Sequence, residues 1–434
     1  MSSIRKVHFI GIGGIGISAV ARLFLAQGKK ISGSDRTANS PVIKELKKLG
    51  AKIYRGHQAK QVSAEVGLVV YTTAIGPDNP EWIESKRRGV PMFSYPEMLG
   101  QLTADKYTIA VAGTHGKTTT TAMLADVLTA GKLDPTVIVG SLLKPKNKKV
   151  SPTNLIIGRS KYFIAEACEY KRAFLNLTPK ILVITNIDND HLDYYRDLAD
   201  IQSAFAELTS SIISTGTLIC DTHDPRLAPI IKVARCRVLD YREFDQQASN
   251  LKLQVIGAHN HLNAAVALAV AKVLKINSSV SARALNKFRG TWRRLEYLGR
   301  TRRGARIYDD YGHHPTEIRA TLAAIRCDLK LQGRLIVVFQ PHLYSRTKLL
   351  FKEFVESFVD ADEILILPIY AAREPVDKTI SSRILAAAIP RAVYVPNMSV
   401  AAKRLSQSAG LKDLILTLGA GPVFVLGEKL RYNR

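Results

Sequence analysis

A short glycine-rich segment of the chain has the residue types that bind phosphate. An apolar, β-branched run, Tyr107–Ala112, leads into Gly113-Thr114-His115-Gly116-Lys117-Thr118-Thr119, and a helix-like segment follows. Glycines let backbone N–H groups converge on phosphate oxygens, and a helix N-terminus adds partial positive charge. Lys117 is placed to reach the β- and γ-phosphates, and the Thr118 hydroxyl to hold Mg²⁺. The segment predicts a site for ATP, although Val111 occupies the first glycine position of the general P-loop pattern.

A second glycine loop opens the chain. The predicted strand Lys6–Ile10 runs into a G-x-G-x-x-G sequence, and a helix pattern follows. The glycines of this loop are Gly11, Gly13, Gly14 and Gly16. Such a loop seats a diphosphate at a helix N-terminus, and Asp35, after the next strand, either meets a ribose or caps a turn. Thr72 and Thr73 follow another strand pattern and should face the same crevice. NAD, FAD and a nucleotide-sugar all present a diphosphate, so the loop alone permits each of them.

Acidic side chains follow two further strand patterns. The run Tyr162–Glu166 ends in a carboxylate, as in a Walker B element whose acid binds Mg²⁺. The run Ile181–Ile187 continues into residues 188–193 (DNDHLD), which gather ligand-type side chains just past a buried strand. The alternative for Glu166 is a surface role, and the alternative for His191 taken alone is a structural role. Beside a phosphate loop, however, Glu166 and His191 are predicted to contact metal or phosphate.

Two later segments could complete a nucleotide site. Residues 257–263 (GAHNHLN) open an alanine-rich helix, in which Asn260 or Asn263 could act as the helix cap. Residues 288–296 (FRGTWRRLE) precede a basic, glycine-containing stretch that ends at Arg306, which makes the stretch a candidate domain boundary. An arginine there could also neutralise the charge of a triphosphate in a transition state.

The last part of the chain repeats the order of strand and helix. Predicted strands at 306–308, 335–339, 363–367 and 417–421 each precede a helix-like pattern, which predicts a second parallel α/β sheet. Polar side chains follow three of these strands, at 309–315 (DDYGHHP), 340–347 (QPHLYSRT) and 368–374 (PIYAARE). The adjacent histidines His313 and His314 lack the i, i+4 zinc spacing, so a metalloprotease is not predicted.

Composition narrows the class of protein. The 434 residues carry a formal net charge of +25, which suits anionic ligands such as nucleotides. The basic residues are spread along the chain without an arginine-rich tail, so no specific nucleic-acid site is predicted. No apolar run is long enough to predict a membrane span. The four cysteines form no CxxC pair, which argues against structural zinc and fits a reducing cytoplasm.

Taken in order, these segments resemble the Mur ligase family over essentially the whole chain. The markers are VHFIGIGGIGISAVA, AGTHGKTTTTAM, TNIDNDHLDYY, FRGTWRRLE, YDDYGHHPTEI and FQPHLYSRT. The resemblance implies an α/β fold with three domains. These would be an N-terminal Rossmann-like domain for a UDP-sugar (residues 1–102), a central P-loop ATPase (103–294) and a C-terminal Rossmann-like domain for the amino acid (295–434).

The resemblance is strongest to members that add L-alanine, and it implies peptide-bond formation during peptidoglycan precursor synthesis in the cytoplasm. The lactyl carboxylate of UDP-N-acetylmuramate would attack the γ-phosphate of ATP, and the amine of L-alanine would then attack the acyl phosphate. A carboxylate that approaches a triphosphate is repelled, so Mg²⁺ and a lysine are needed to screen the charge. ATP and Mg²⁺ are therefore the implied cofactors.

The resemblance also implies roles for individual residues. The implied catalytic residues are Lys117, Glu166, His191, His313 and Arg346. The implied ATP-binding residues are Gly113, Thr114, His115, Gly116, Lys117, Thr118, Thr119, His259, Asn263, Arg294 and Asp310. The implied UDP-sugar residues are Gly11, Gly13, Gly14, Gly16, Asp35, Thr72 and Thr73. The implied amino-acid side comprises Tyr311, His342, Tyr344 and Arg346, and the implied metal ligands are Thr118, Glu166 and His191.

The sequence departs from the family pattern in two places. The family commonly has arginine after the histidine of FQPH, where this chain has Leu343, so Arg346 and Arg373 are the expected alternatives for the alanine carboxylate. After Glu166 the chain reads Ala167-Cys168-Glu169-Tyr170, where many members have an acidic run. Cys168 is expected to be structural.

Three other functions are compatible with parts of the sequence. A recycling ligase that joins UDP-N-acetylmuramate to a preformed tripeptide shares much of the N-terminal signature. A nicotinamide-dependent oxidoreductase would use the loop Gly11–Gly16 and would not need Lys117. A regulatory protein would bind ATP without substrate-dependent release of ADP.

Overall fold

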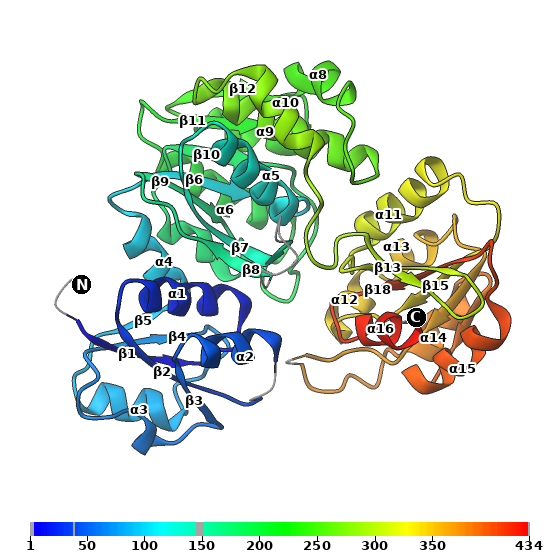
Figure 1. Ribbon diagram of the computed structural model, residues 1–434, viewed down its shortest axis with the longest axis horizontal. Helices are drawn as coiled ribbons and strands as arrows, with labels where there is room; N and C mark the ends of the chain where they lie inside the picture. The colour runs from blue at the N-terminus through cyan, green and yellow to red at the C-terminus, as the bar shows by residue number, and fades with distance from the viewer. Residues whose placement is uncertain (1–3, 38–39, 145–151, 373, 433–434) are drawn as a thin grey trace.

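The chain folds into three α/β domains, each built on its own largely parallel sheet (Figure 1). The computed structural model describes residues 4–37, 40–144, 152–372 and 374–432. The expected α/β architecture with three sheets is confirmed. Within the described ranges, no helix is long and apolar enough to cross a membrane.

The N-terminal sheet has the strand order β3-β2-β1-β4-β5, and all its strand pairs are parallel. Its strands are β1 (Lys6–Ile10), β2 (Lys30–Asp35), β3 (Lys52–Arg55), β4 (Leu68–Tyr71) and β5 (Met92–Ser94). Its helices are α1 (Ile15–Ala26), α2 (Pro41–Lys48), α3 (Pro80–Arg87) and α4 (Tyr95–Thr103), with a 3₁₀ turn at Ala59–Gln61. The glycine loop therefore connects the central strand β1 to α1, at the carboxyl edge of the sheet.

Helix α4 lies at the expected end of this domain. The apolar run from Val90 (VPMFSYPEML) predicts a strand by sequence, with a linker at Gln101–Lys106, but in the structure the strand ends at Ser94 and α4 continues to Thr103. The reason is a capping box, in which Ser94 and Glu97 exchange side-chain and backbone hydrogen bonds. The domain boundary predicted after residue 102 thus falls in the last turn of a helix.

The central sheet has the order β12-β11-β10-β6-β9-β7-β8, and only its β7–β8 pair is antiparallel among the described strands. Its strands are β6 (Tyr107–Ala112), β7 (Thr136–Leu143), β8 (Thr153–Ile156), β9 (Tyr162–Glu166), β10 (Ile181–Ile184), β11 (Thr217–Cys220) and β12 (Arg237–Asp240). Its helices are α5 (Lys117–Ala130), α6 (Leu198–Ser210), α7 (Ala228–Lys232), α8 (Asp245–Ser249), α9 (Ala258–Val273) and α10 (Ser278–Asn286). Short 3₁₀ segments occur at Tyr170–Asn176, Pro225–Leu227 and Tyr241–Phe244.

The inner strands of the central sheet are largely apolar, as expected where both faces of a sheet are covered. On one face, Ala110 and Ala112 of β6 join a buried cluster that extends into the N-terminal domain. On the other face, Ile109 and Val111 pack in the cluster formed with α5 and α9. The edge strand β8 also meets α1, where Asn154 donates a hydrogen bond to Ser18 at 2.9 Å. The N-terminal and central domains therefore share both apolar and polar contacts.

The C-terminal sheet has the order β13-β14-β18-β15-β16-β17. Its strands are β13 (Glu296–Arg300), β14 (Arg306–Asp310), β15 (Leu335–Phe339), β16 (Glu363–Ile366), β17 (Ala392–Tyr394) and β18 (Leu414–Leu418). Its helices are α11 (Pro315–Asp328), α12 (Tyr344–Leu349), α13 (Phe351–Glu356), α14 (Ser382–Ala388), α15 (Met398–Ser408) and α16 (Phe424–Leu430). The basic stretch expected at the domain boundary contains β13, which pairs antiparallel with β14 as an edge strand.

Arg293 anchors the chain where it enters the C-terminal domain. Its guanidinium donates to Asp309 at 2.8 Å and to the carbonyls of Gly419 and Gly421, and only 3% of the residue is exposed. Burial raises the pKa of Asp309, and the charge of Arg293 opposes that shift. The pair therefore fixes the backbone directly before Arg294, which lines the cavities beside the phosphate loop.

Candidate active site

The phosphate loop has the geometry that its sequence predicts. It connects β6 to α5, and Gly113 and Gly116 have φ angles of 122° and 84°, which side chains rarely tolerate. A Cβ on Gly116 would lie 2.5 Å from Oδ1 of Asn263. Both glycines are therefore required, the second because α9 packs directly against the loop.

Lys117 is held by its own loop and by a carboxylate that the sequence did not single out as a site residue. Its Nζ donates to the carbonyls of Gly113 and Thr114 at 2.5 and 2.9 Å and to Oε1 of Glu169 at 2.9 Å. Burial lowers the pKa of Lys117, but the charge and hydrogen bond of Glu169, together with the nearby Cys168 and Glu166, outweigh that effect, and the pKa rises. Lys117 is thus a largely buried cation that is paired with Glu169.

The predicted metal ligands lie beside this lysine. Thr118 Oγ1 donates to Oε1 of Glu166 at 2.9 Å, and the backbone N–H of Gly140 donates to its Oε2 at 2.7 Å. Nε2 of His191 lies 3.7 Å from Oε1 of Glu169. Among the described residues, Oε2 of Glu169 and Nδ1 of His191 are buried without a hydrogen-bond partner. Such unsatisfied atoms are costly unless a ligand completes them.

A cavity of about 360 Å³ lies on the α9 side of the phosphate loop. It brings together predicted nucleotide residues from distant parts of the chain: His115, Gly116, Thr119, His259, Asn263, Arg294 and Asp310. The sequence allowed Asn260 or Asn263 to cap α9. Neither does so, because Gly257 occupies the N-cap position. Instead Asn260 and Asn263 bond each other at 3.2 Å and face this cavity. Asn260 was therefore missed as a site residue.

A second cavity, of about 520 Å³, lies where the three domains meet. The N-terminal domain contributes Gly16 and Tyr95, and the central domain contributes Lys117, Thr118, Glu166 and His191. The C-terminal domain contributes Tyr311, His313, His342 and Arg346. Both cavities include Gly116 and Arg294, so the phosphate loop connects them. We refer to the second cavity as the central cleft.

The N-terminal glycine loop is fixed by the residues predicted to surround it. Asp35 Oδ2 accepts the backbone N–H of Gly13 at 2.9 Å, and a Cβ on Gly11 would lie 2.3 Å from the methyl group of Thr72. Tyr95 covers Gly16 in the same way. Gly14 is the N-cap of α1, which has no side-chain cap, and Thr73 is exposed. Asp35 thus accepts a hydrogen bond from the glycine loop itself, as a residue that caps a turn would.

On the C-terminal side, Arg346 is engaged across the domain boundary. Its guanidinium donates to Oδ1 of Asp190 at 2.6 and 3.1 Å and contacts Nδ1 of His342 at 3.0 Å. Leu343 is buried and lines the central cleft. Tyr344 begins α12, and it is not among the residues that line either cavity. The expected alternative Arg373 lies outside the described residues.

Comparisons with known proteins agree with this geometry. Residues 6–107 match the Mur ligase catalytic domain, 111–249 the Mur ligase middle domain, and 293–421 the Mur ligase glutamate ligase domain. A curated protein of Desulforamulus reducens is 40% identical over 98% of this chain and 97% of its own length. The chain belongs to the Mur ligase family.

The similar family members have related names. The proteins of Desulforamulus reducens and Clostridium kluyveri, the latter 41% identical over the same shares of both chains, are each named UDP-N-acetylmuramate–L-alanine ligase. A crystal structure of the enzyme of that name from Thermotoga maritima matches with a TM-score of 0.79 and 26% identity, covering 98% of both chains. A murein peptide ligase from Psychrobacter arcticus shares the fold, with a TM-score of 0.75 and 24% identity.

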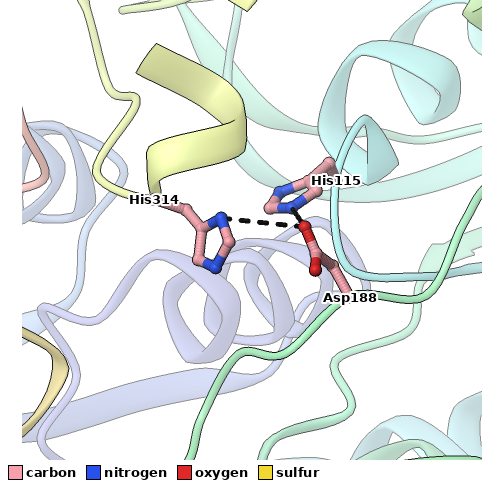
Figure 2. Close-up of side chains that lie close together, drawn as sticks. All are labelled: His115, Asp188 and His314. Carbon is pink, nitrogen blue, oxygen red and sulfur yellow. Dashed lines mark hydrogen bonds and ion pairs between the residues drawn. The ribbon is translucent and has the colours of Figure 1, made fainter. Parts of the chain in front are cut away.

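In this Mur ligase, a polar contact joins the phosphate loop to the C-terminal domain (Figure 2). Nε2 of His115 lies 3.2 Å from Oδ2 of Asp188, and Nδ1 of His314 lies 3.8 Å from the same oxygen. That oxygen also accepts the hydroxyl of Thr316 at 2.7 Å, while Nδ1 of His115 lies 3.3 Å from Glu317. Although the three side chains in Figure 2 could surround a cation, protein hydrogen bonds already occupy their facing atoms. We interpret the group as an interdomain contact.

This contact should titrate at alkaline pH. Burial lowers the pKa of His115, but hydrogen bonds with Asp188 and Glu317 raise it overall to about 9. A histidine with a raised pKa stabilises the folded state fully below its unfolded pKa of about 6.5, and this contribution is lost as pH rises through 9. We expect the His115 imidazole resonance to titrate near pH 9, and the thermal unfolding temperature to fall between pH 7 and 10.

The His115→Gln variant should lack both the resonance and most of that fall. His223→Gln, which changes an exposed histidine of the same domain, is the matched control and should keep both. A His115 midpoint near pH 6.5 would contradict the prediction.

Proposed function

We propose that this Mur ligase joins L-alanine to the lactyl carboxylate of UDP-N-acetylmuramate at the expense of ATP, in peptidoglycan precursor synthesis. The observation that carries the proposal is the 40% identity to a curated ligase of that name over nearly the whole of both chains. The central cleft supports it, because the three domains each line the space in which three substrates must meet.

The proposed ATP site spans the phosphate loop and the cavity beside α9. The loop amides and Lys117 would hold the phosphates, and the base would lie among His259, Asn260 and Asn263. Arg294 reaches both cavities from the anchored segment after Arg293, a suitable position from which to neutralise charge on the transferred phosphoryl group. All of these residues surround one continuous path from the base to the central cleft.

The residues around Lys117 fit a divalent cation. Thr118, Glu166, Glu169 and His191 offer oxygen and nitrogen donors, and the buried unpartnered atoms of Glu169 and His191 are what a ligand set lacking its ion would show. Bound Mg²⁺ would screen the negative charge of the triphosphate and the attacking carboxylate. Glu169 takes the place of the acidic run that the family commonly has here.

His313 presents a neutral imidazole to the central cleft. Burial and the nearby charge of Arg346 lower the pKa of His313 to about 4, so its imidazole is neutral at pH 7. Its Nδ1 lies 3.0 Å from the carbonyl of Tyr311, which accepts a hydrogen bond and so assigns the proton to Nδ1. Nε2 then carries the lone pair, within the central cleft.

Arg346 is the proposed anchor for the alanine carboxylate, in the absence of an arginine at position 343. It is the cation that the C-terminal domain presents to the central cleft beside His313 and His342. Its carboxylate partner in the structure, Asp190, occupies the position that a substrate carboxylate would take. The buried Leu343 adds apolar surface suited to a small side chain.

The test is phosphate release from ATP in the presence of Mg²⁺ and UDP-N-acetylmuramate, with L-alanine, glycine, L-serine or the tripeptide added in turn. We expect release only when UDP-N-acetylmuramate and L-alanine are both present, and its loss when EDTA removes Mg²⁺. Release with the tripeptide instead would establish the recycling ligase, whose fold this chain shares. Release with none of the acceptors would contradict the proposal.

A further inference from the structure

A buried polar cluster lies behind the glycine loop of the N-terminal domain. Its centre is the carboxylate of Glu81, in the first turn of α3, whose side chain is 0% exposed. Oε1 of Glu81 lies 3.0 Å from Nε2 of His8, and Oε2 lies 2.8 Å from Nδ1 of His57 and 2.5 Å from the hydroxyl of Ser34. Nδ1 of His8 lies 2.9 Å from the hydroxyl of Ser32. We call these five residues the Glu81 cluster.

Stability alone does not account for this arrangement. Removing a carboxylate and two imidazoles from water is costly, and well-packed apolar side chains of similar volume are commonly as stable or more so. The other polar neighbours of Glu81 are Asn79, which caps α3, Ser85, which donates to the backbone carbonyl of Glu81 at 2.6 Å, and Gln61, whose side-chain amide donates to Oε1 at 2.8 Å. What the cluster adds is a rigid connection between α3, β1, β2 and the turn at His57.

Two of these elements hold the glycine loop. The backbone carbonyl of Ser34 accepts the N–H groups of Gly11 and Ile12 at 2.8 and 3.0 Å. The next residue, Asp35, accepts the N–H of Gly13 through its side chain and the N–H of Gly56 through its backbone. Gly56 directly precedes His57. The end of β2 and the turn at His57 therefore support the loop from behind, and Glu81 ties them together.

This support leaves the first amides of α1 for a ligand. The N–H groups of Gly11, Ile12 and Gly13 are used within the protein, whereas α1 has no side-chain cap at its N-terminus. Ile15 and Gly16, in the first turn of α1, line the central cleft. A helix N-terminus with free amides suits a diphosphate, and its direction depends on how the loop before it is held.

We infer that Glu81 is a positioning residue for the diphosphate of the nucleotide-sugar, acting through Ser34, His57 and the glycine loop. The inference rests on the proposed function, because that function supplies the ligand. It concerns binding of one substrate, so the affinity for ATP and the rate of the chemical step should be independent of the cluster.

Isothermal titration calorimetry with UDP-N-acetylmuramate, without ATP or L-alanine, tests this directly. We expect Glu81→Gln and the milder Ser34→Ala to raise the dissociation constant about tenfold, which corresponds to the loss of one well-placed interaction. The KM for UDP-N-acetylmuramate should rise in parallel, while kcat and the KM for ATP stay within about twofold. Ser85→Ala, one turn away on α3 and equally buried, is the matched control and should bind normally.

The possible outcomes are distinct. Weaker binding in both cluster variants, with normal binding in Ser85→Ala, supports the inference. A merely structural role predicts a lower unfolding temperature in all three variants with unchanged dissociation constants, and that result overturns it. If Glu81→Gln does not fold, Ser34→Ala alone decides. Absence of binding by the unsubstituted chain would overturn both the inference and the proposed function.

Discussion

Replacement of Lys117 by alanine is expected to lower kcat by roughly 10²–10³-fold or more, the scale for losing one preorganised group that stabilises transition-state charge. Lys117 is largely buried, its pKa is raised, and it lines the central cleft beside the phosphate loop. The measurement is phosphate release at saturating ATP, UDP-N-acetylmuramate and L-alanine.

The variant also removes the cation that faces Glu169, so loss of folding must be separated from loss of catalysis. Lys117→Met combined with Glu169→Gln removes both charges and should keep the unfolding temperature while turnover remains low. Lys272→Ala, at an exposed position of α9, is the lysine control and should leave turnover unchanged. Near-normal turnover in Lys117→Ala would refute the assigned role.

Replacement of Arg346 by alanine should lower kcat/KM for L-alanine by roughly 10²–10³-fold, since loss of a buried, hydrogen-bonded charged anchor for a ligand costs about 2–5 kcal/mol of binding. Arg346 and Asp190 are 6% and 9% exposed and lie in different domains. Loss of the arginine removes the proposed carboxylate anchor and leaves Asp190 as an unpaired negative charge in the central cleft. That charge would repel an incoming carboxylate as well.

Steady-state kinetics with L-alanine varied at saturating ATP and UDP-N-acetylmuramate measure this effect. Arg346→Lys keeps the charge but not the planar fork, so it should recover only part of the loss. Lys348→Ala changes an exposed cation of the same helix and serves as the control. If the KM for L-alanine is unchanged in Arg346→Ala, the amino acid is anchored elsewhere.

Much of this molecule could be predicted because its signals are local. The phosphate loop, its flanking strand and helix, and Glu166 at the end of β9 follow from short patterns. The capping box that begins α4 was equally local, since Ser94-Tyr95-Pro96-Glu97 is its sequence signature, but the apolar run from Val90 favoured a strand. The capping box is the stronger of these two local patterns, and it decides that the chain is helical from Tyr95.

The remaining site features depend on contacts between distant segments. Asn260 faces the nucleotide cavity only because Gly257, with a φ of 102°, starts α9 and leaves the asparagine side chains free of capping. The pair of Arg346 with Asp190 forms across two domains, and spacing within either segment gives no sign of it. Glu169 was visible as an acid after Glu166, but its contact with Lys117 depends on how the segment after β9 turns back toward the phosphate loop.

The contact between Lys117 and Glu169 has a thermodynamic consequence for the order of events. A phosphate that binds Lys117 must displace Glu169, and the released carboxylate is then available beside His191 as a donor for a divalent cation. The two equilibria are therefore linked: whatever factor nucleotide adds to the affinity for the cation, the cation adds to the affinity for nucleotide. In such an arrangement neither ligand would saturate the site efficiently alone, and without a ligand Lys117 is neutralised by a carboxylate of its own chain.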